Sequence, residues 1–199
     1  MYLSLARQAR MAEKKDASLA IVQEGRKDYL SDKNLALEEL DLYFALGRGS
    51  EAKSKLEDAI RMDSTRSDLY SILGNMYDQE AADSKLQQKD RDVSKAKALA
   101  AYKKAIKLEP LNMESNFNMG VYHFNKAAEL TKKINDMDIT TYQKKGKAAE
   151  ADAKKEFANA LPYFEACYKK DPNDASARKS LKSTYMRLDR QADAEKIPD

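Results

Sequence analysis

The stretch SDLYSILGNMYDQEAADS, residues 67–84, gives the clearest indication of the fold. Four of its residues lie three, four and seven positions apart, which places them on one face of a helix: Tyr70, Leu73, Gly74 and Tyr77. Glycine inside a helix costs about 1 kcal/mol relative to alanine, so Gly74 needs a structural reason. The missing Cβ would let a second helix approach closely. The stretch therefore predicts one half of a tightly packed helical pair.

A related pattern recurs at a spacing of about 34 residues. Tyr43 lies one such interval before Tyr77, and Tyr2 lies two intervals before Tyr70. Gly120 repeats the glycine further along the chain. The second half of a unit reads Ala98-x-x-x-Tyr102-x-x-Ala105-Ile106-x-x-x-Pro110. Large and small residues therefore alternate on both helices of a repeating pair.

These motifs resemble the tetratricopeptide repeat family, whose signature combines aromatic-x-x-Leu-Gly-x-x-Tyr with a second helix that ends near proline. The resemblance covers nearly the whole chain. It implies an all-α fold, a right-handed α-α superhelix (solenoid) of stacked antiparallel helical hairpins. Treated as one array over residues 1–199, the chain divides into repeats at about 1–32, 33–66, 67–112, 113–174 and 175–199.

Two insertions interrupt the repeat, at about residues 78–97 and 124–159. Compared with the uninterrupted unit from Tyr43 to Ala52, the first adds about 12 residues and the second about 28. Both segments keep helical spacing of apolar residues, so we expect two hairpins with extended helices. About 14 extra residues per helix would project roughly 20 Å in the longer case. The tip is expected within residues 135–146, where Met137, Ile139 and Tyr142 are candidate protrusion contacts.

The composition gives little support to an enzyme. There is one histidine, His123, which we interpret as a packing residue, and one cysteine, Cys167, at a place that takes small residues in other units. Glycine-rich phosphate loops and paired-cysteine or zinc-binding motifs are absent from the sequence. We therefore expect no catalytic residues, no metal and no cofactor. Carboxylates alternate with lysines and are interpreted as solvated helix faces.

The net charge of +3 is mixed along the chain, so no nucleic-acid partner is expected. The sequence contains neither an apolar run long enough to span a bilayer nor a secretory signal, and the compartment stays open. The first helix begins almost at Tyr2, without a preceding polar cap. From this we expect the chain to be the C-terminal portion of a longer repeat protein, with Leu3, Leu5 and Val22 exposed at its N-terminal end.

The family resemblance implies a concave face lined by the first helix of each repeat, and this face is the predicted partner-binding site. The candidate residues are Asn34, Leu37, Asp41, Phe44, Asp68, Ser71, Asn75, Asp78, Glu114, Phe117, Val121 and Phe124. Some family members clamp a peptide carboxylate with lysine, arginine and asparagine. Here Asn75 and Asn118 match, but serines replace the basic residues, so we expect no such clamp.

The sequence therefore favours a noncatalytic protein-interaction scaffold for a peptide or protein segment of unknown identity. Binding would use the concave face and also the protruding hairpins. Two alternatives stay open: a structural subunit that self-associates through the hairpins, and an RNA-binding helical-repeat protein, which is less favoured. The oligomeric state is open as well.

Overall fold

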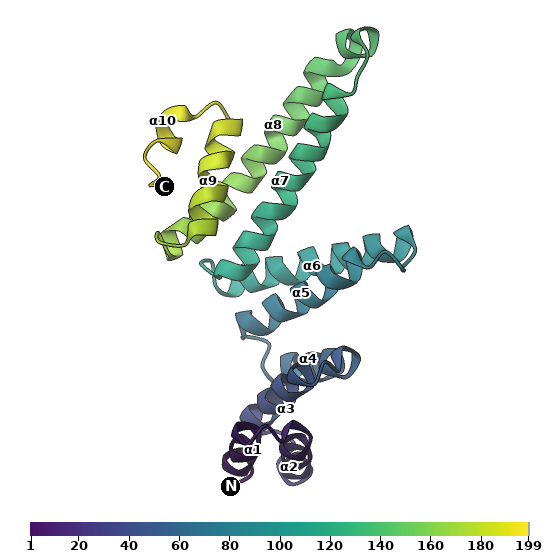
Figure 1. Ribbon diagram of the computed structural model, residues 1–199, viewed down its shortest axis with the longest axis vertical. Coiled ribbons are helices and arrows are strands. Elements are labelled where there is room, and N and C mark those ends of the chain that lie inside the picture. The colour runs from purple at the N-terminus through teal and green to yellow at the C-terminus, as the bar shows by residue number, and fades with distance from the viewer. Residues whose placement is uncertain (199) are drawn as a thin grey trace. The chain divides into compact units, whose positions relative to one another are not determined.

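The computed structural model describes residues 1–198, which form ten α-helices and no β-strand (Figure 1). The predicted all-α fold is therefore confirmed. The helices are α1 (Tyr2–Met11), α2 (Lys15–Asp28), α3 (Lys33–Ala45), α4 (Gly49–Met62), α5 (Ser67–Ala82), α6 (Gln88–Leu108), α7 (Met113–Asn135), α8 (Ile139–Lys170), α9 (Ala175–Arg187) and α10 (Gln191–Ala194).

The helix starts follow a regular spacing. α2 and α4 begin one repeat length apart, about 34 residues, and so do α3 and α5. The intervals from the start of α5 to that of α7, and from α7 to α9, are longer. The excess in each case equals the length of the insertion counted in the sequence. The repeat boundaries themselves stay a prediction.

Polar side chains fix where several of these helices begin. Asp32 accepts hydrogen bonds from the backbone N–H groups of Asn34 and Leu35 at the start of α3. Asn112 and Asp174 cap α7 and α9 in the same manner. Each cap satisfies a backbone donor that the helix leaves unpaired, which is worth about 1 kcal/mol. The first helices of three hairpins therefore start at a capping residue in the sequence.

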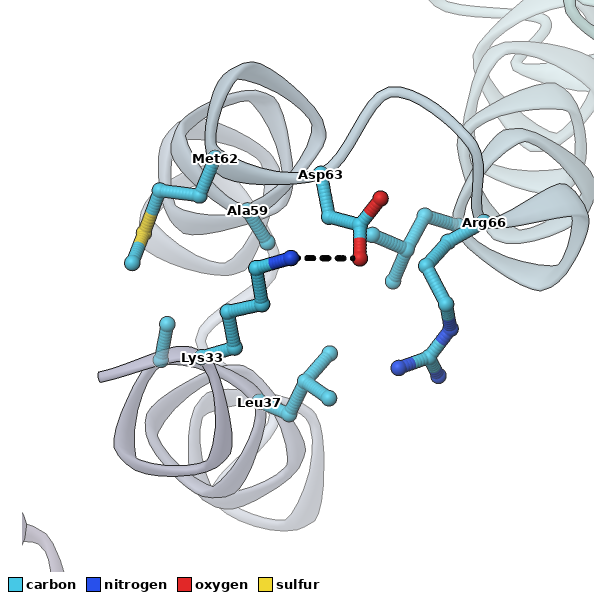
Figure 2. Close-up of a pocket in the computed structure, with 8 residues that line it drawn as sticks. Lys33, Leu37, Ala59, Met62, Asp63 and Arg66 are labelled. Carbon is cyan, nitrogen blue, oxygen red and sulfur yellow. Dashed lines mark hydrogen bonds and ion pairs between the residues drawn. The ribbon is translucent and has the colours of Figure 1, made fainter. Parts of the chain in front are cut away.

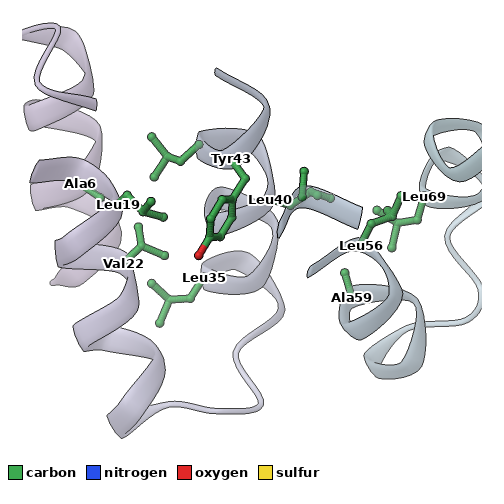
Figure 3. Close-up of a cluster of buried hydrophobic side chains, with 11 residues drawn as sticks. Ala6, Leu19, Val22, Leu35, Leu40, Tyr43, Leu56, Ala59 and Leu69 are labelled. Atoms are coloured by element: carbon green, nitrogen blue, oxygen red, sulfur yellow. The ribbon is translucent and has the colours of Figure 1, made fainter. Parts of the chain in front are cut away.

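The chain divides into two compact units, residues 1–101 and 102–199, with the division inside α6. In the first unit, α1 packs on α2 and α3 packs on α4, while α2 also contacts α3. Figure 3 shows the core that these helices share, including Leu19, Leu40 and Leu56. Val22 is completely buried in this core, so the prediction that it is exposed was wrong. Leu5, in contrast, is 46% exposed.

Two adjacent carboxylates of α3 are buried between helices of the first unit. Glu39 is paired with Arg26 of α2 at 3.3 Å and with Lys55 of α4 at 3.2 Å. Glu38 is paired with Arg7 and Arg10 of α1. The interpretation of the carboxylates as solvated helix faces was therefore wrong at these two positions. α3 is covered by neighbours on several faces, so charged residues there are buried and must be paired.

The second unit is built around the long hairpin of α7 and α8, with α9 packed on α8 and α10 on α9. Ala160, Phe164, Leu181 and Tyr185 lie at the centre of its core, and Phe117 of α7 packs against it. A Cβ added to Gly120 would lie 2.6 Å from the ring of Phe164. Glycine at this position therefore lets α7 and α8 approach closely.

The tip of the long hairpin is shorter than expected. α7 ends at Asn135 and α8 begins at Ile139, so only residues 136–138 connect them. The turn lies within the predicted range of 135–146, but residues 139–146 already belong to α8, which Asp138 caps by accepting from the Thr141 N–H at 3.0 Å. The extra length is also shared unequally. α7 has 23 residues against 13 in α3, whereas α8 has 32 against 14 in α4.

Candidate interaction surfaces

A pocket of about 200 Å³ lies among α7, α8 and α9 in the second unit. Val121 and Phe124, two of the predicted contact residues, line it from α7. Phe164 contributes from α8. The remaining lining residues are Asn125 from α7 and Lys179, Ser180 and Ser183 from α9. The pocket thus has apolar walls from two helices and a polar edge from a third.

The aromatic walls of this pocket are held in place by ring contacts. The ring centroids of Phe124 and Phe157 lie 5.1 Å apart, and those of Phe124 and Phe164 lie 6.4 Å apart, both edge to face. Such pairs add about 0.5–1.5 kcal/mol to the burial of the rings. The pocket is therefore formed before any ligand binds, while the exposed Lys179 leaves a cation at its edge.

The other two α7 candidates lie differently. Phe117 is half-buried, and its ring lies 5.8 Å from that of Phe164 in an edge-to-face contact. Phe117 therefore does not line the pocket but packs against Phe164, which does. Glu114 is exposed in the first turn of α7 and does not line the pocket.

The α3 candidates of the first unit are mostly accessible. Asn34 and Asp41 are exposed, and Phe44 is 38% exposed. Burial raises the pKa of Asp41, an effect that Glu38 reinforces and Arg10 opposes. Leu37 lines a cavity of about 10 Å³ beside the ion pair of Lys33 and Asp63 (Figure 2). That volume holds about one water molecule, so this cavity is no ligand site.

The α5 candidates are more restricted. Asp68 is exposed and pairs with Arg66, which lowers the pKa of its carboxyl group. Asp78 pairs with Lys95 of α6 at 2.5 Å. Asn75 is half-buried, and Ser71 is only 1% exposed, which leaves its hydroxyl inaccessible to a partner. The accessible acidic candidates of the first unit are therefore Asp41 and Asp68.

The protrusion candidates lie at the tip of the long hairpin. Ile139 is 78% exposed and Tyr142 is 41% exposed, whereas Met137 is half-buried. The Tyr142 hydroxyl donates to Glu150 at 2.6 Å, and its ring lies against Gly146. Tyr142 thus packs along α8, while Ile139 is free to contact a partner.

His123 and Lys126 of α7 form a cluster with Glu156 of α8. Of these residues, only His123 was singled out from the sequence. His123 Nδ1 lies 2.8 Å from Glu156 Oε2, and Lys126 Nζ lies 2.7 Å from Glu156 Oε1. Burial raises the pKa of Glu156, but hydrogen bonds from Lys126, His123 and Asn159 outweigh it and lower the pKa to about 2. The His123 ring also stacks on Tyr163. The cluster therefore fastens the two helices together.

Cys167 is buried and donates to the Met113 carbonyl oxygen at 3.4 Å. Burial, with a contribution from Asp174, raises the pKa of its thiol to about 12, which leaves almost no reactive thiolate.

In residues 1–198, the structure brings together no group of three or more His, Cys, Asp or Glu side chains that could hold a metal ion. None of the helices in this part of the chain combines the length and apolar character that crossing a membrane requires.

Comparison with known proteins gives a likeness in fold. No protein-family model and no curated protein matches the sequence. The solved structure of MamA matches with a TM-score of 0.61 and 17% identity, over 98% of this chain and 85% of that one. YrrB, described as a TPR protein with an unusual peptide-binding site, matches at 0.58 and 18%, over 98% and 80%. TTC0263, a thermophilic TPR protein of Thermus thermophilus, matches at 0.50 and 15%, over 93% and 97%.

These matches agree with the motifs in the sequence and with the spacing of the helix starts. Helical-repeat folds of this kind typically present extended surfaces for protein binding. The chain therefore has a TPR-like helical-repeat fold, which is an all-α solenoid.

Proposed function

We propose that this protein is a noncatalytic interaction module that binds a segment of a partner protein along the first helices of its hairpins. The observation that carries the proposal is the preformed pocket of Val121, Phe124 and Phe164 with Lys179 at its edge. Its volume of about 200 Å³ suits one large apolar side chain rather than a drug-sized ligand. The peptide-binding site named for YrrB, a protein of the same fold, supports the proposal.

The chemistry of the pocket defines the preferred segment. A leucine, methionine or phenylalanine side chain would contact the aromatic walls. A carboxylate next to it in the partner would lie near Lys179, which has no acidic neighbour in its own helix α9. In the first unit, Asp41 and Asp68 would favour basic groups of a partner. The second unit thus prefers an acidic-apolar segment, and the first unit a basic one.

A peptide selection tests this function. Random peptides displayed on phage are selected against the intact chain, and the dissociation constants of enriched sequences are measured by fluorescence anisotropy. We expect enriched peptides to combine a large apolar residue with an adjacent Asp or Glu. Selection that enriches no sequence would contradict the proposed function.

A pair of substitutions assigns the binding to the pocket. Ser183→Tyr places a ring into the pocket from α9 and should weaken the binding of selected peptides at least tenfold. Ser176→Tyr is the matched control, since Ser176 is exposed on the same helix and does not line the pocket. Equal affinities for both variants would place the binding elsewhere.

A further inference from the structure

The tip of the long hairpin exposes apolar groups at the end of a rigid support. Ile139 occupies the first position of α8, directly after the capping residue Asp138. Its side chain is 78% exposed, although an isoleucine gains about 1.5–3 kcal/mol from burial. Figure 1 shows that this tip is the far end of the α7–α8 pair within the second unit. The far end of this hairpin therefore carries an exposed aliphatic side chain.

The same region carries the net charge of the protein. Residues 130–147, here called the hairpin tip, contain five lysines and two aspartates, a net charge of +3. The whole chain also has a net charge of +3, so all other residues together are neutral. One of the two aspartates, Asp138, is engaged in capping α8. The positive charge is thus concentrated around the exposed isoleucine.

The five lysines are available to a partner. All are exposed, and within residues 1–198 the structure shows no ion pair for any of them: Lys132, Lys133, Lys144, Lys145 and Lys147. Lys132 and Lys133 lie in the last turn of α7. The other three lie within about 12 Å of the start of α8, at 1.5 Å per residue. Their ammonium groups can therefore reach a surface that meets the tip.

We propose that the hairpin tip binds the surface of an anionic lipid membrane, with Ile139 inserted among the acyl chains and the lysines at the headgroups. Proteins usually bind such surfaces by inserting apolar side chains among the acyl chains while their lysines are attracted to the anionic headgroups. Long lysine side chains can keep their charge at the headgroups while their stems lie deeper. This inference concerns a different surface from the peptide pocket and goes beyond the proposed function.

A membrane fits the tip better than an acidic protein does. A stable protein interface takes about 20–30 residues from each partner, more than the whole of residues 130–147 can supply. The tip is the end of two helices joined by residues 136–138 alone, so it is narrow and offers little area to a rigid partner. A fluid lipid surface can rearrange around such a narrow tip and contact it on all sides. Concentrated positive charge further selects lipids with negative headgroups.

Vesicle sedimentation tests the proposal directly. The intact chain is mixed, at about 0.1 M salt, with vesicles of phosphatidylcholine alone or with vesicles that also contain about 30% anionic phosphatidylserine. We expect binding to the anionic vesicles only, and its loss at about 0.5 M salt because salt screens the attraction. Equal binding to neutral vesicles, or no binding to anionic ones, would overturn the proposal. Tight binding to soluble polyglutamate without vesicle binding would assign the tip to an acidic protein and overturn it too.

Matched charge variants separate local charge from net charge. The tip variant carries Lys132→Gln, Lys133→Gln, Lys144→Gln and Lys145→Gln. The control carries glutamine at four exposed lysines elsewhere: Lys85, Lys89, Lys107 and Lys169. Each lysine near an anionic surface contributes about fivefold to binding, so the tip variant should lose measurable binding while the control retains it. Equal binding by the two variants would refute a contact at the tip.

A tryptophan reporter tests insertion independently. The chain contains no tryptophan, so Ile139→Trp introduces a single tryptophan at the tip, whose emission is separated from that of the tyrosines by excitation at its long-wavelength edge. We expect its emission to shift to shorter wavelength when anionic vesicles are added. Leu30→Trp is the control, because Leu30 is 71% exposed in a loop of the first unit. An identical response of the two reporters would rule out insertion through Ile139.

Discussion

The short hairpins of the first unit and the long hairpin of the second unit join their helices by different chemistry. In the first unit, buried Glu38 and Glu39 of α3 connect to basic residues of α1, α2 and α4. In the second unit, α7 and α8 are joined by aromatic rings around Phe164 and by the Glu156 cluster. The helix starts of both regions follow the same repeat spacing once the length of each insertion is subtracted.

The difference shows what the repeat requires and what it leaves free. Both regions place a glycine where an aromatic side chain covers it: Tyr2 covers Gly25, and Phe164 covers Gly120. Close helix approach is therefore common to both hairpin types. The groups that fill the remaining space can be charged or apolar, provided that buried charges are paired. Substitutions in the aromatic contacts of the long hairpin and in the ion pairs of the short hairpins should therefore lower the free energy of unfolding by different amounts.

Removing Phe164 should have the largest effect. Its side chain is 1% exposed and contacts Phe117, Phe124 and the site of Gly120. Phe164→Ala leaves a cavity, and we expect a loss of about 3–5 kcal/mol in the free energy of unfolding. Urea unfolding followed by circular dichroism measures it. A loss below about 1 kcal/mol would mean that the aromatic cluster does not hold the long hairpin.

Removing Glu39 should come next. Glu39→Ala leaves Arg26, whose side chain is 15% exposed, without its partner. Breaking a buried pair on one side costs about 3–5 kcal/mol, and we expect about 2–4 kcal/mol because Lys55 is more exposed. Glu38→Ala is the control, since Arg7 and Arg10 remain solvated, and its cost should be about 1 kcal/mol. If the two variants unfold at the same urea concentration, Glu39 has no special role.

The two covered glycines give a smaller, paired test. Gly120→Ala should destabilise by about 1–3 kcal/mol, because the enclosed Phe164 ring cannot move away from the new methyl group. Gly25→Ala should cost less, because Tyr2 lies at the start of α1 and can shift. Thermal unfolding of both variants measures the difference. A larger cost at Gly25 would contradict the assignment of Phe164 as the immobile partner.

The Glu156 cluster gives the smallest effect and a pH dependence. The pKa of Glu156 is lowered from its usual 4.5 to about 2, so the charged form stabilises the fold. This contribution is complete above about pH 5 and is lost as the pH falls towards 2. Glu156→Gln should therefore cost about 1–2 kcal/mol at neutral pH. Urea unfolding of both proteins at about pH 6 and about pH 3 measures the gap, which should narrow at the lower pH.

The repeat spacing and the lengths of the insertions could be predicted from the sequence because helix packing requires large and small residues at fixed intervals. The exact bounds of the turn at the tip, residues 136–138 within the predicted 135–146, could not. Ile139, Thr140 and Gly146 have low helix propensity, and only the cap by Asp138 and the packing of Tyr142 on Gly146 place them in α8. Helix capping and side-chain packing within α8 outweigh the low helix propensity of these residues.

The candidate surfaces were predictable to a smaller extent. Helix periodicity indicated which face of α7 carries Val121 and Phe124, but not that α9 would supply Ser183 to the same pocket. The partners of Glu38 and Glu39 lie in other helices, beyond the reach of any local pattern. Ile139 could be singled out because an aliphatic side chain is conspicuous in a polar stretch.

The long hairpin should be an ordinary repeat of about 34 residues, here called the repeat frame, to which the insertion adds length at the tip. Deleting residues 126–135 and 139–156 removes the whole excess and restores helices as long as α3 and α4, with residues 136–138 as the turn. Urea unfolding of this shortened chain, followed by circular dichroism, measures whether the frame holds. We predict cooperative unfolding and a helix signal reduced by the deleted residues alone. A chain that loses cooperative unfolding would contradict the repeat frame.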